Sequence, residues 1–369
     1  MKSFYIANSA YLNQDLPGVQ AWNKIYKMIG THSTLVDRCE SIQMPYNFKL
    51  YEPFKMPRDL VDFNKSYEDC CEERTKELVE LSRHLGKPIT IFYSGGIDST
   101  LVLISFMKYL SKEEFQSRIR VALSMESITE NANFFYDYVR PNCNMINSDN
   151  IHNMFDGSTI MVGGEHNDQL FGSDIIGNIY RVYGDFGEMN KTYSREHALK
   201  WFKNYMDEPT ANIWFDLLDN HIKTQAPCEV TTNFHFWWWL NFSFKWQNVF
   251  FRMIVRINKD HRSNITHDFV RNYFHHFYST ENFQRWSMLN HDLKIKDSWA
   301  TYKWESKRLI YEFNRDKVYL DEKVKIGSLV KLFLQKTMPQ AVTSNFEFLN
   351  TVSLENLDDY YNPNNSFIR

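Results

Sequence analysis

One stretch, PITIFYSGGIDSTLVLISF from residue 88 to 106, constrains the fold of this chain more than any other. Its first part is rich in β-branched and aromatic residues, which is typical of a short buried parallel strand. Its last part carries apolar residues at helical spacing. Glycines, hydroxyl side chains and one carboxylate fill the turn between them. The sequence therefore predicts a strand that passes through a glycine turn directly into a helix, which is the repeating unit of α/β folds.

Strand-like and helix-like segments alternate on both sides of this stretch. Helical spacing runs from Asp62 to Leu85, and Gly86 is the predicted stop. Strand-like runs follow at 119–124, 144–148 and 158–162, with a helix-like run at 131–139. We therefore expect an α/β fold with a parallel sheet and flanking helices.

Beyond about residue 186 the strand signal fades, and aromatic, helix-leaning stretches continue to the end of the chain. Aromatic residues make up 16% of the sequence. The most apolar run, 234–251, is interrupted by polar residues, so we expect a buried helix there and no membrane span. The pattern predicts three regions: a mixed region at 1–85 with no assigned role, an α/β domain at 86–185, and a mainly helical region at 186–369 that ends in a loose tail.

Composition argues against several classes of partner. The formal net charge is −3, which gives no footprint for nucleic acid or for an anionic membrane. The five cysteines form no C-x-x-C pair, which argues against a disulfide frame and a zinc site and favours reduced thiols in the cytoplasm. The first residues lack the sustained apolar stretch of a signal peptide. We therefore expect a cytoplasmic protein without a membrane or nucleic-acid partner.

The glycine turn has the chemistry of a phosphate-binding loop. Gly95 and Gly96 allow a ligand to approach the backbone closely, and the helix that follows favours an anion at its N-terminus. The hydroxyl groups that add donors are those of Ser94, Ser99 and Thr100. The lysine of the commonest phosphate loop is absent, and Asp98 stands inside the turn instead. A carboxylate beside phosphate needs an intervening cation, so we expect Asp98 to bind Mg²⁺. The simpler alternative is a Gly-Gly turn in which Asp98 caps the helix.

The run SGGIDS, residues 94–99, resembles the S-G-G-x-D-S signature of the N-type ATP pyrophosphatases, also called the PP-loop family. The resemblance implies an adenine nucleotide alpha hydrolase-like (HUP-like) fold. It also implies that the turn holds the pyrophosphate of ATP while a nucleophile attacks the α-phosphorus.

A second run, VGGEHNDQLFGSD at 162–174, is similar to the S-G-E-G-x-D-E-L-F-G-G run of asparagine and β-lactam synthetases. The matching positions are Gly164, Glu165, Asp168, Leu170, Phe171 and Gly172, and the departures are Gly163, His166, Gln169 and Ser173. The resemblance implies that Gly164 lies at the nucleotide, that Asp168 is a second Mg²⁺ ligand and that Glu165 assists the incoming nucleophile. His166 is interpreted as a residue that shapes the pocket. The alternative for Glu165 and Asp168 is a solvated loop with helix caps.

A third similarity concerns basic residues. YKWESKRLIYEF, residues 302–313, falls where asparagine synthetases carry a K-x-x-L-R helix. There Lys303 fits the lysine that steadies transition-state charge, whereas Ser306 and Lys307 depart from the leucine and the arginine. Lys323 and Lys325 precede a glycine, as in the K-x-G segment of that family. A solvated lysine face is the alternative for each lysine.

In PP-loop enzymes the adenine edge lies after the second strand, which places Ser124 and Met125 there. Together the resemblances predict an ATP- and Mg²⁺-dependent, AMP-forming ligase of asparagine synthetase type. Its substrates would be a small carboxylate or carbonyl compound and ammonia or another amine, bound by the helical substrate and lid region.

The family's glutaminase domain has no counterpart in residues 1–85, where Lys2 stands in place of the nucleophilic cysteine. We therefore expect a stand-alone synthetase unit, of a kind also seen in phage genomes, that takes free ammonia or draws on a separate ammonia donor. Two alternatives stay open. One is a PP-loop enzyme that modifies a nucleobase or tRNA, and the other is a nucleotide-binding interaction module without catalysis.

Overall fold

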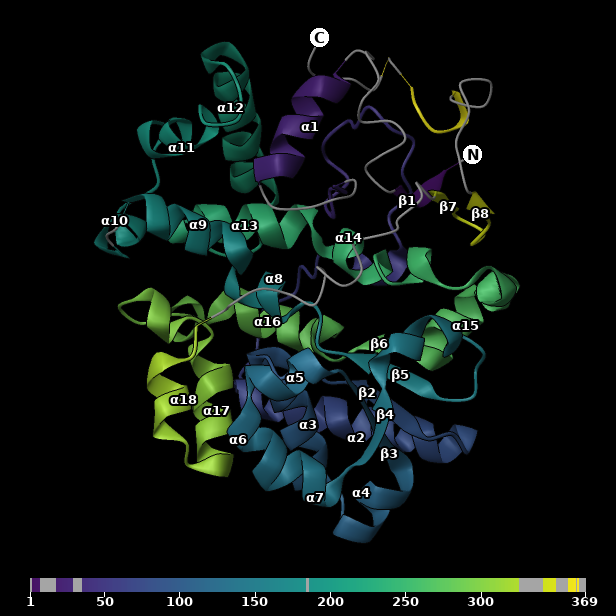
Figure 1. Cartoon of the computed structure of the whole chain (residues 1–369). Coiled ribbons are helices and arrows are strands. Elements are labelled where there is room, and N and C mark those ends of the chain that lie inside the picture. The colour runs from purple at the N-terminus through teal and green to yellow at the C-terminus, as the bar shows by residue number, and fades with distance from the viewer. Residues whose placement is uncertain are drawn as a thin grey trace. The chain divides into compact units, whose positions relative to one another are not determined.

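The computed structural model describes residues 2–6, 18–28, 35–183, 186–324, 341–349, 358–362 and 364 (Figure 1). The chain divides into two compact units. The sheet unit comprises residues 61–167 and 257–335, and the aromatic unit comprises residues 1–60, 168–256 and 336–369. This division differs from the three consecutive regions expected from the sequence, because the chain leaves the sheet unit after Asn167 and returns to it at Ile257.

A five-stranded parallel sheet forms the centre of the sheet unit, which confirms the α/β prediction. The strands are β2 (Ile89–Phe92), β3 (Ile119–Leu123), β4 (Asn144–Asn147), β5 (Ile160–Gly163) and β6 (Phe274–His276). Their order is β4-β3-β2-β5-β6, and every neighbouring pair is parallel. The sequence pattern missed β6, because its three residues, two of them histidines, are too short and too polar to show a strand period.

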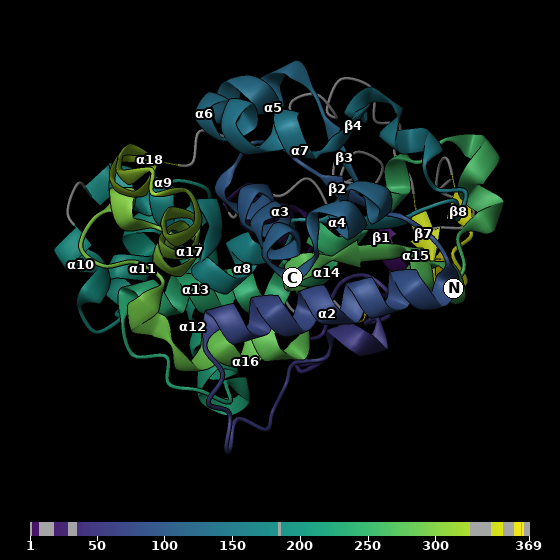
Figure 2. The same cartoon turned by 90° about the horizontal axis from the view of Figure 1, so that it is seen from below.

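Helices cover this sheet. The longer ones are α2 (Tyr67–Leu85), α3 (Ile97–Tyr109), α4 (Lys112–Arg118), α15 (His267–Tyr273), α16 (Glu281–Leu289) and α17 (Trp304–Asn314). The shorter ones are α5 (Met125–Glu130), α6 (Ala132–Phe134), α7 (Arg140–Asn142), α18 (Lys317–Glu322), a π-helix η2 (Phe135–Val139) and the 3₁₀ turns η3 (Ser148–Asn153), η5 (Lys259–Asn264), η6 (Phe277–Ser279), η7 (His291–Leu293) and η8 (Trp299–Thr301). Helix α3 packs against both α2 and α17. Figure 2 shows α16 running beside α2, which it contacts.

The ends of α2 follow from local chemistry. Ser66 and Asp69 form a reciprocal capping box at its start, so the helix begins five residues later than the apolar spacing suggested. Gly86 ends it in the left-handed conformation, at φ 62°, as predicted. Because α2 packs on α3, it belongs to the sheet unit rather than to a separate N-terminal region.

The aromatic unit is mainly helical. Its elements are β1 (Ser3–Ile6), α1 (Val19–Met28), η1 (Glu52–Phe54), α9 (Ser173–Tyr183), α10 (Phe186–Asn190), α11 (Arg195–Phe202), α12 (Glu208–Gln225), α13 (Asn233–Phe244), α14 (Trp246–Phe251), η4 (Ile254–Arg256), β7 (Ala341–Thr343) and β8 (Phe348–Leu349). The strands form a small antiparallel sheet in the order β1-β7-β8. Every residue of α13 except His235 is buried, as is every residue of α14, which confirms the predicted buried aromatic helix.

The start of the asparagine-rich tail is not loose, in contrast to the prediction. Tyr360 and Tyr361 are 2% and 5% exposed, and Tyr361 forms an antiparallel bridge with Tyr46. Two tyrosine rings supply enough apolar area to anchor this segment despite its polar neighbours. Most of the remaining tail lies outside the described residues.

No helix among the described residues has the length and apolar character needed to span a membrane.

Candidate functional site

The predicted glycine turn lies between β2 and α3. Gly95 has φ +76°, and a Cβ on it would stand 2.3 Å from the backbone oxygen of Ser127, so only glycine fits. Ser99 Oγ accepts the Ser94 N–H at 3.0 Å, and Ser94 Oγ accepts the Gly96 N–H at 3.3 Å. Gly96 is the N-cap of α3 and provides no side-chain cap. The turn is therefore preformed, and the helix begins with no side-chain oxygen from its N-cap residue.

The second glycine run packs directly against the first. A Cβ on Gly164 would lie 3.2 Å from the Ser99 nitrogen and 3.3 Å from Asp98 Cβ. A Cβ on Gly163 would lie 2.7 Å from His276 Nδ1, on the neighbouring strand β6. Parallel strands present their carboxyl ends at one edge of the sheet, and the turns after β2 and β5 meet there.

His166 stands where the motif quoted above has a glycine, and its backbone adopts a conformation that glycine adopts most readily. Its φ is +74°, its side chain is fully buried, and its ring contacts that of His276 edge-on at a centroid distance of 5.3 Å. A left-handed residue other than glycine is uncommon, although histidine is among those that tolerate it best. A glycine could therefore replace His166 without a change of the backbone conformation.

The carboxylate of Asp98 supplies the negative charge beside the glycine turn, and other side chains bind it. Lys303 Nζ donates to both of its carboxylate oxygens at 2.6 Å, and Asn167 Nδ2 donates to Oδ1 at 2.7 Å. The hydroxyl of Tyr278 also donates to the backbone oxygen of Asp98 at 2.9 Å. The side chain of Lys303 is 2% exposed and that of Asp98 is 25% exposed. A buried ammonium therefore faces a carboxylate that is open to solvent on one side.

Asn167 connects this pair to two further helices. Its Oδ1 accepts the Tyr67 hydroxyl of α2 at 2.6 Å, and its Nδ2 donates to Ser306 Oγ of α17 at 3.1 Å. Tyr67 and Ser306 are themselves 3.1 Å apart, oxygen to oxygen. Sequence reasoning missed this network, because Asn167 fell on the variable position of the motif and Ser306 counted only as a departure. The only sequence feature that could have indicated a role for Asn167 was its position next to Asp168.

The structure gives the two helical lysines different partners. Lys303 precedes α17 in the left-handed conformation, at φ 60°, a costly backbone state for a lysine. Lys307 Nζ instead donates to the backbone oxygens of Ala300 at 2.7 Å and Lys323 at 3.1 Å. Burial lowers the pKa of Lys307 to about 8. We interpret Lys307 as a structural residue that links α17 to the backbone at Ala300 and at Lys323. Lys303, in contrast, contacts Asp98 and belongs to the candidate site.

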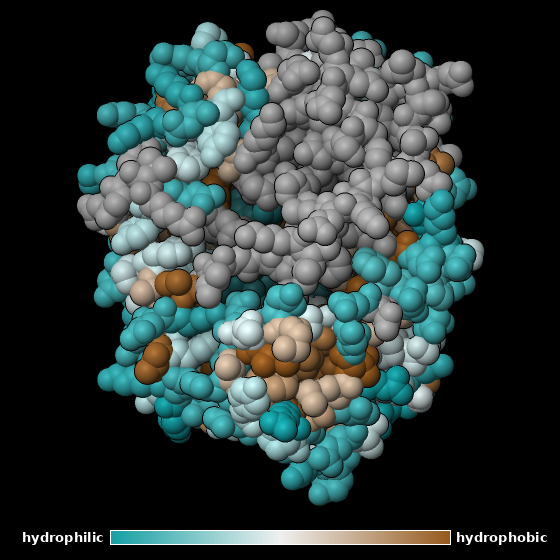
Figure 3. All heavy atoms as spheres, in the orientation of Figure 1, coloured by the Kyte–Doolittle hydropathy of each residue, from teal (hydrophilic) through white to brown (hydrophobic). Residues whose placement is uncertain are grey.

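The remaining predicted residues are distributed around the turn. Ser124 shares a capping box with Ser127 at the start of α5, and Met125 is 71% exposed. Figure 3 shows an apolar patch over the region where Figure 1 draws α5 and β4, which carry the exposed Met125 and Met145. Thr100 is fully buried and bonds back to the Gly95 oxygen at 3.5 Å, so its hydroxyl faces the interior.

The two acidic residues of the second motif differ in position. Glu165 is half-buried in the turn that follows β5, and Asp168 is the first residue of the aromatic unit. The backbone oxygen of Asp168 in α8 (Asn167–Phe171) accepts the N–H of Gly172 at 2.9 Å and Asn241 Nδ2 at 3.4 Å. Lys325 lies outside the described residues.

The donor set around the glycine turn fits a magnesium-bound polyphosphate. Carboxylate and hydroxyl oxygens are the ligands that Mg²⁺ prefers. Glycine backbone and an uncapped helix start suit phosphate oxygens. The ammonium of Lys303 now neutralises the Asp98 carboxylate, so it and a metal ion would compete for the same two oxygens.

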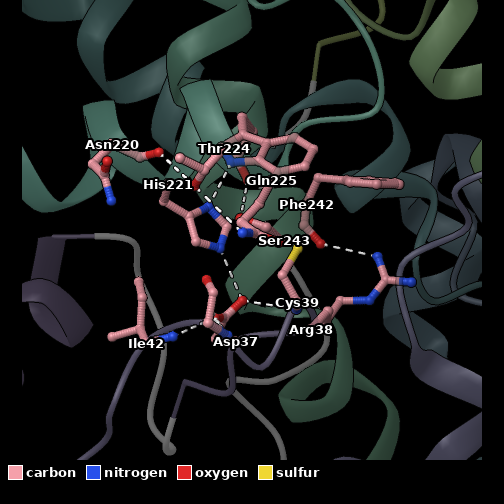
Figure 4. Close-up of polar contacts among 12 residues, drawn as sticks. Asp37, Arg38, Cys39, Ile42, Asn220, His221, Thr224, Gln225, Phe242 and Ser243 are labelled. Carbon is pink, nitrogen blue, oxygen red and sulfur yellow. Dashed lines mark hydrogen bonds and ion pairs between the residues drawn. The ribbon is translucent and has the colours of Figure 1, made fainter.

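A second cluster, Asp37, Cys39 and His221 in the aromatic unit, has metal-like spacing, with one ligand atom of each within 4.8 Å of the others (Figure 4). Its hydrogen bonds argue against a metal. The indole N–H of Trp239 donates to His221 Nδ1 at 3.0 Å, so in the neutral ring Nε2 carries the proton and donates to Asp37 Oδ1 at 3.0 Å. A metal on Nε2 would need a proton on Nδ1, which Trp239 cannot accept.

The other donors to Asp37 also point to a structural role. Its carboxylate accepts the backbone N–H groups of Cys39, Ser41 and Ile42. Burial, and then the charge of Asp37, raise the pKa of the Cys39 thiol to about 12. A thiol of this kind stays protonated and is a poor ligand. We interpret the cluster as a hydrogen-bonded core element.

Comparison with protein-family models gave no match, and searches of curated proteins and of solved structures likewise gave none.

Proposed function

We propose that this protein is an ATP-dependent, AMP-forming ligase of the PP-loop class, with a site built around the turn after β2. The observation that carries the proposal is the Asp98 carboxylate: it stands inside a glycine turn at a helix start, paired with the buried Lys303 and held by Asn167. A carboxylate in a turn that binds phosphate would repel the phosphate unless a cation bridges the two, so its presence favours a metal-bound ligand.

In this proposal the two glycine turns share the nucleotide. The backbone of Gly95 and Gly96 and the start of α3 hold phosphate oxygens, and the Ser94 and Ser99 hydroxyls set the shape of the turn. Asp98 holds Mg²⁺. The resemblance of the second motif gives Asp168, which directly follows Asn167 in the chain, as the second metal ligand. Ser124 and Met125 line the adenine edge.

Lys303 exchanges partners in the proposed cycle. Before loading, its ammonium neutralises Asp98 at 2.6 Å. With Asp98 holding Mg²⁺, Lys303 would be free to turn to the negative charge that develops on the phosphates, where a fixed cation in a dry site contributes most. Its left-handed backbone conformation and its near-complete burial restrict the Lys303 side chain to the vicinity of Asp98.

Bound Mg-ATP supplies an electrophilic α-phosphorus, which a carboxylate oxygen of the acceptor attacks while pyrophosphate leaves. Ammonia or another amine then forms the amide and releases AMP. Glu165, in the turn after β5, takes up the proton that the amine loses. Substrate alignment and electrostatic preorganisation would supply most of the rate.

The test incubates the full chain with ATP, Mg²⁺, ammonium and a panel of small carboxylic acids, and follows AMP and pyrophosphate. We expect both products in equal amounts, dependent on one acid of the panel, and no product from Asp98→Asn. Nucleotide binding without turnover would favour the interaction module instead. Release of ADP and phosphate would contradict the proposal.

A further inference from the structure

A second acid–lysine pair stands beside the glycine turn. Lys323 Nζ lies 3.1 Å from Glu130 Oε1 and 3.4 Å from the backbone oxygen of Glu130. Glu130 is the last residue of α5, and Lys323 follows α18. Their side chains are 23% and 9% exposed. No sequence motif pointed to Glu130.

Glu130 packs on the turn itself. A Cβ on Gly95 would lie 3.0 Å from Glu130 Cβ, and a Cβ on Gly96 would lie 3.4 Å from Glu130 Oε1. A carboxylate of the chain therefore stands next to the glycines that are best suited to hold phosphate. Lys303 and Lys323 are both paired with carboxylates beside the turn.

We propose that Glu130 is a built-in competitor for the phosphate site: its carboxylate stands beside Gly96 and retains Lys323, and a bound polyphosphate displaces it and takes over Lys323. This inference rests on the proposed function, since it concerns the same turn, and adds Glu130 and Lys323 to its binding residues.

The electrostatic balance favours such an exchange. A triphosphate carries several negative charges, so it repels Glu130 and attracts Lys323 more strongly than one carboxylate can. Without ligand, Glu130 keeps the ammonium of a 9% exposed lysine paired, which avoids the cost of a buried unpaired charge. The pair thus stabilises the empty site and weakens binding of any anion that does not bring enough charge.

The experiment measures the affinity of the full chain for ATP, inorganic pyrophosphate and adenosine by calorimetry in the presence of Mg²⁺. Glu130→Gln should bind ATP and pyrophosphate about tenfold more tightly, because a like charge beside the phosphates is gone. Its affinity for adenosine should not change. Glu126→Gln is the matched control, since it removes the same charge from the same short helix, and its phosphate affinity should stay within about twofold of wild type.

Lys323→Met separates contact with phosphate from simple neutralisation of Glu130. If Lys323 contacts phosphate, this change weakens pyrophosphate binding in the wild type and also in the Glu130→Gln background. If it has no effect in that background, the inference is wrong. Equal or weaker binding by Glu130→Gln also overturns it.

Circular dichroism checks the folding of each variant. Should Glu130→Gln fail to fold, Glu130→Asp decides: it keeps the charge but draws it back from Gly96, so pyrophosphate should bind more tightly than to wild type, and unchanged affinity overturns the inference. A wild type that binds neither ATP nor pyrophosphate refutes the proposed function together with this inference. A wild type that binds both, with no gain in the Glu130 variants, refutes the inference alone.

Discussion

Each unit contains an aspartate that is paired with a buried basic side chain, and the two pairs are built differently. Asp37 in the aromatic unit is 3% exposed and accepts, besides His221, three N–H groups of its own turn. The Asp98 side chain is 25% exposed and is bound by Lys303 and Asn167, which are 205 and 69 residues away in the chain. A carboxylate enclosed by its own turn is fixed, whereas one held by distant side chains can exchange them. We therefore interpret the first pair as structural, and the second pair is the one on which the proposed function rests.

The largest expected effect tests the structural half of this comparison. Asp37→Ala leaves His221 and three backbone N–H groups without their acceptor, which should lower the free energy of unfolding by about 3–5 kcal/mol. Urea denaturation measures it, with the exposed Glu229→Ala as control. If the free energy of unfolding falls by less than about 1 kcal/mol, Asp37 does not have the stabilising role that its contacts indicate.

For the Asp98–Lys303 pair, the comparison predicts that a substitution lowers activity without a comparable loss of stability. Lys303→Met should lower kcat for AMP formation about 10²–10³-fold, because it removes the fixed cation beside the phosphates. The exposed Lys317→Met, on neighbouring α18, is the matched control. If Lys303→Met unfolds the protein as readily as Asp37→Ala does, the contrast between the two pairs disappears.

A smaller effect is expected one step away from Asp98. Tyr67→Phe removes the hydroxyl that bonds Asn167 at 2.6 Å, so Asn167 should orient Asp98 less well. The Mg²⁺ concentration for half-maximal AMP formation should rise about tenfold, while kcat at saturating Mg²⁺ changes little. A metal titration of both proteins measures this, and an unchanged requirement for Mg²⁺ would assign Tyr67 to packing alone.

Acid unfolding should show the smallest difference. Burial alone would raise the pKa of Asp37, but the hydrogen bond and charge of His221 and the N–H groups of Cys39 and Ile42 outweigh it and lower the pKa below 3.8. The stabilisation is therefore complete above about pH 4 and is lost as pH falls through the lowered pKa, by less than about 1.4 kcal/mol per pH unit. Unfolding curves of wild type and Asp37→Asn should converge in that range, and a constant gap would contradict this.

Much of the sheet could be predicted from the sequence, because β2, β3 and β5 are largely buried, mainly apolar runs bounded by turn residues, whereas β4 is a more polar and exposed edge strand. The predicted segments 88–93, 119–124, 144–148 and 158–162 all contain strands of the sheet. The last strand, β6, escaped because histidines replace its apolar residues and because it lies beyond the region where strands alternate with helices. Side-chain periodicity cannot reveal such a strand.

The residues of the candidate site also fall into those that the sequence indicates and those that it does not. The glycines and Asp98 are recognisable, because the backbone conformation and the charge restrict the residue type. Asn167, Tyr67 and Glu130 are not, because their roles come from contacts between segments far apart in the chain. Lys303 could be proposed only by resemblance, and its conformation and its bond to Asp98 required the structure.

The interrupted course of the chain through the sheet unit has a practical consequence for dissecting this protein. A fragment truncated after residue 167 would keep the glycine turns but lose β6, α17 and Lys303, all of which come from residues 257–335. Such a fragment would expose one side of β5 and leave Asp98 without its ammonium partner. An autonomous minimal version would have to splice both segments into one polypeptide, for example by circular permutation, instead of trimming either end.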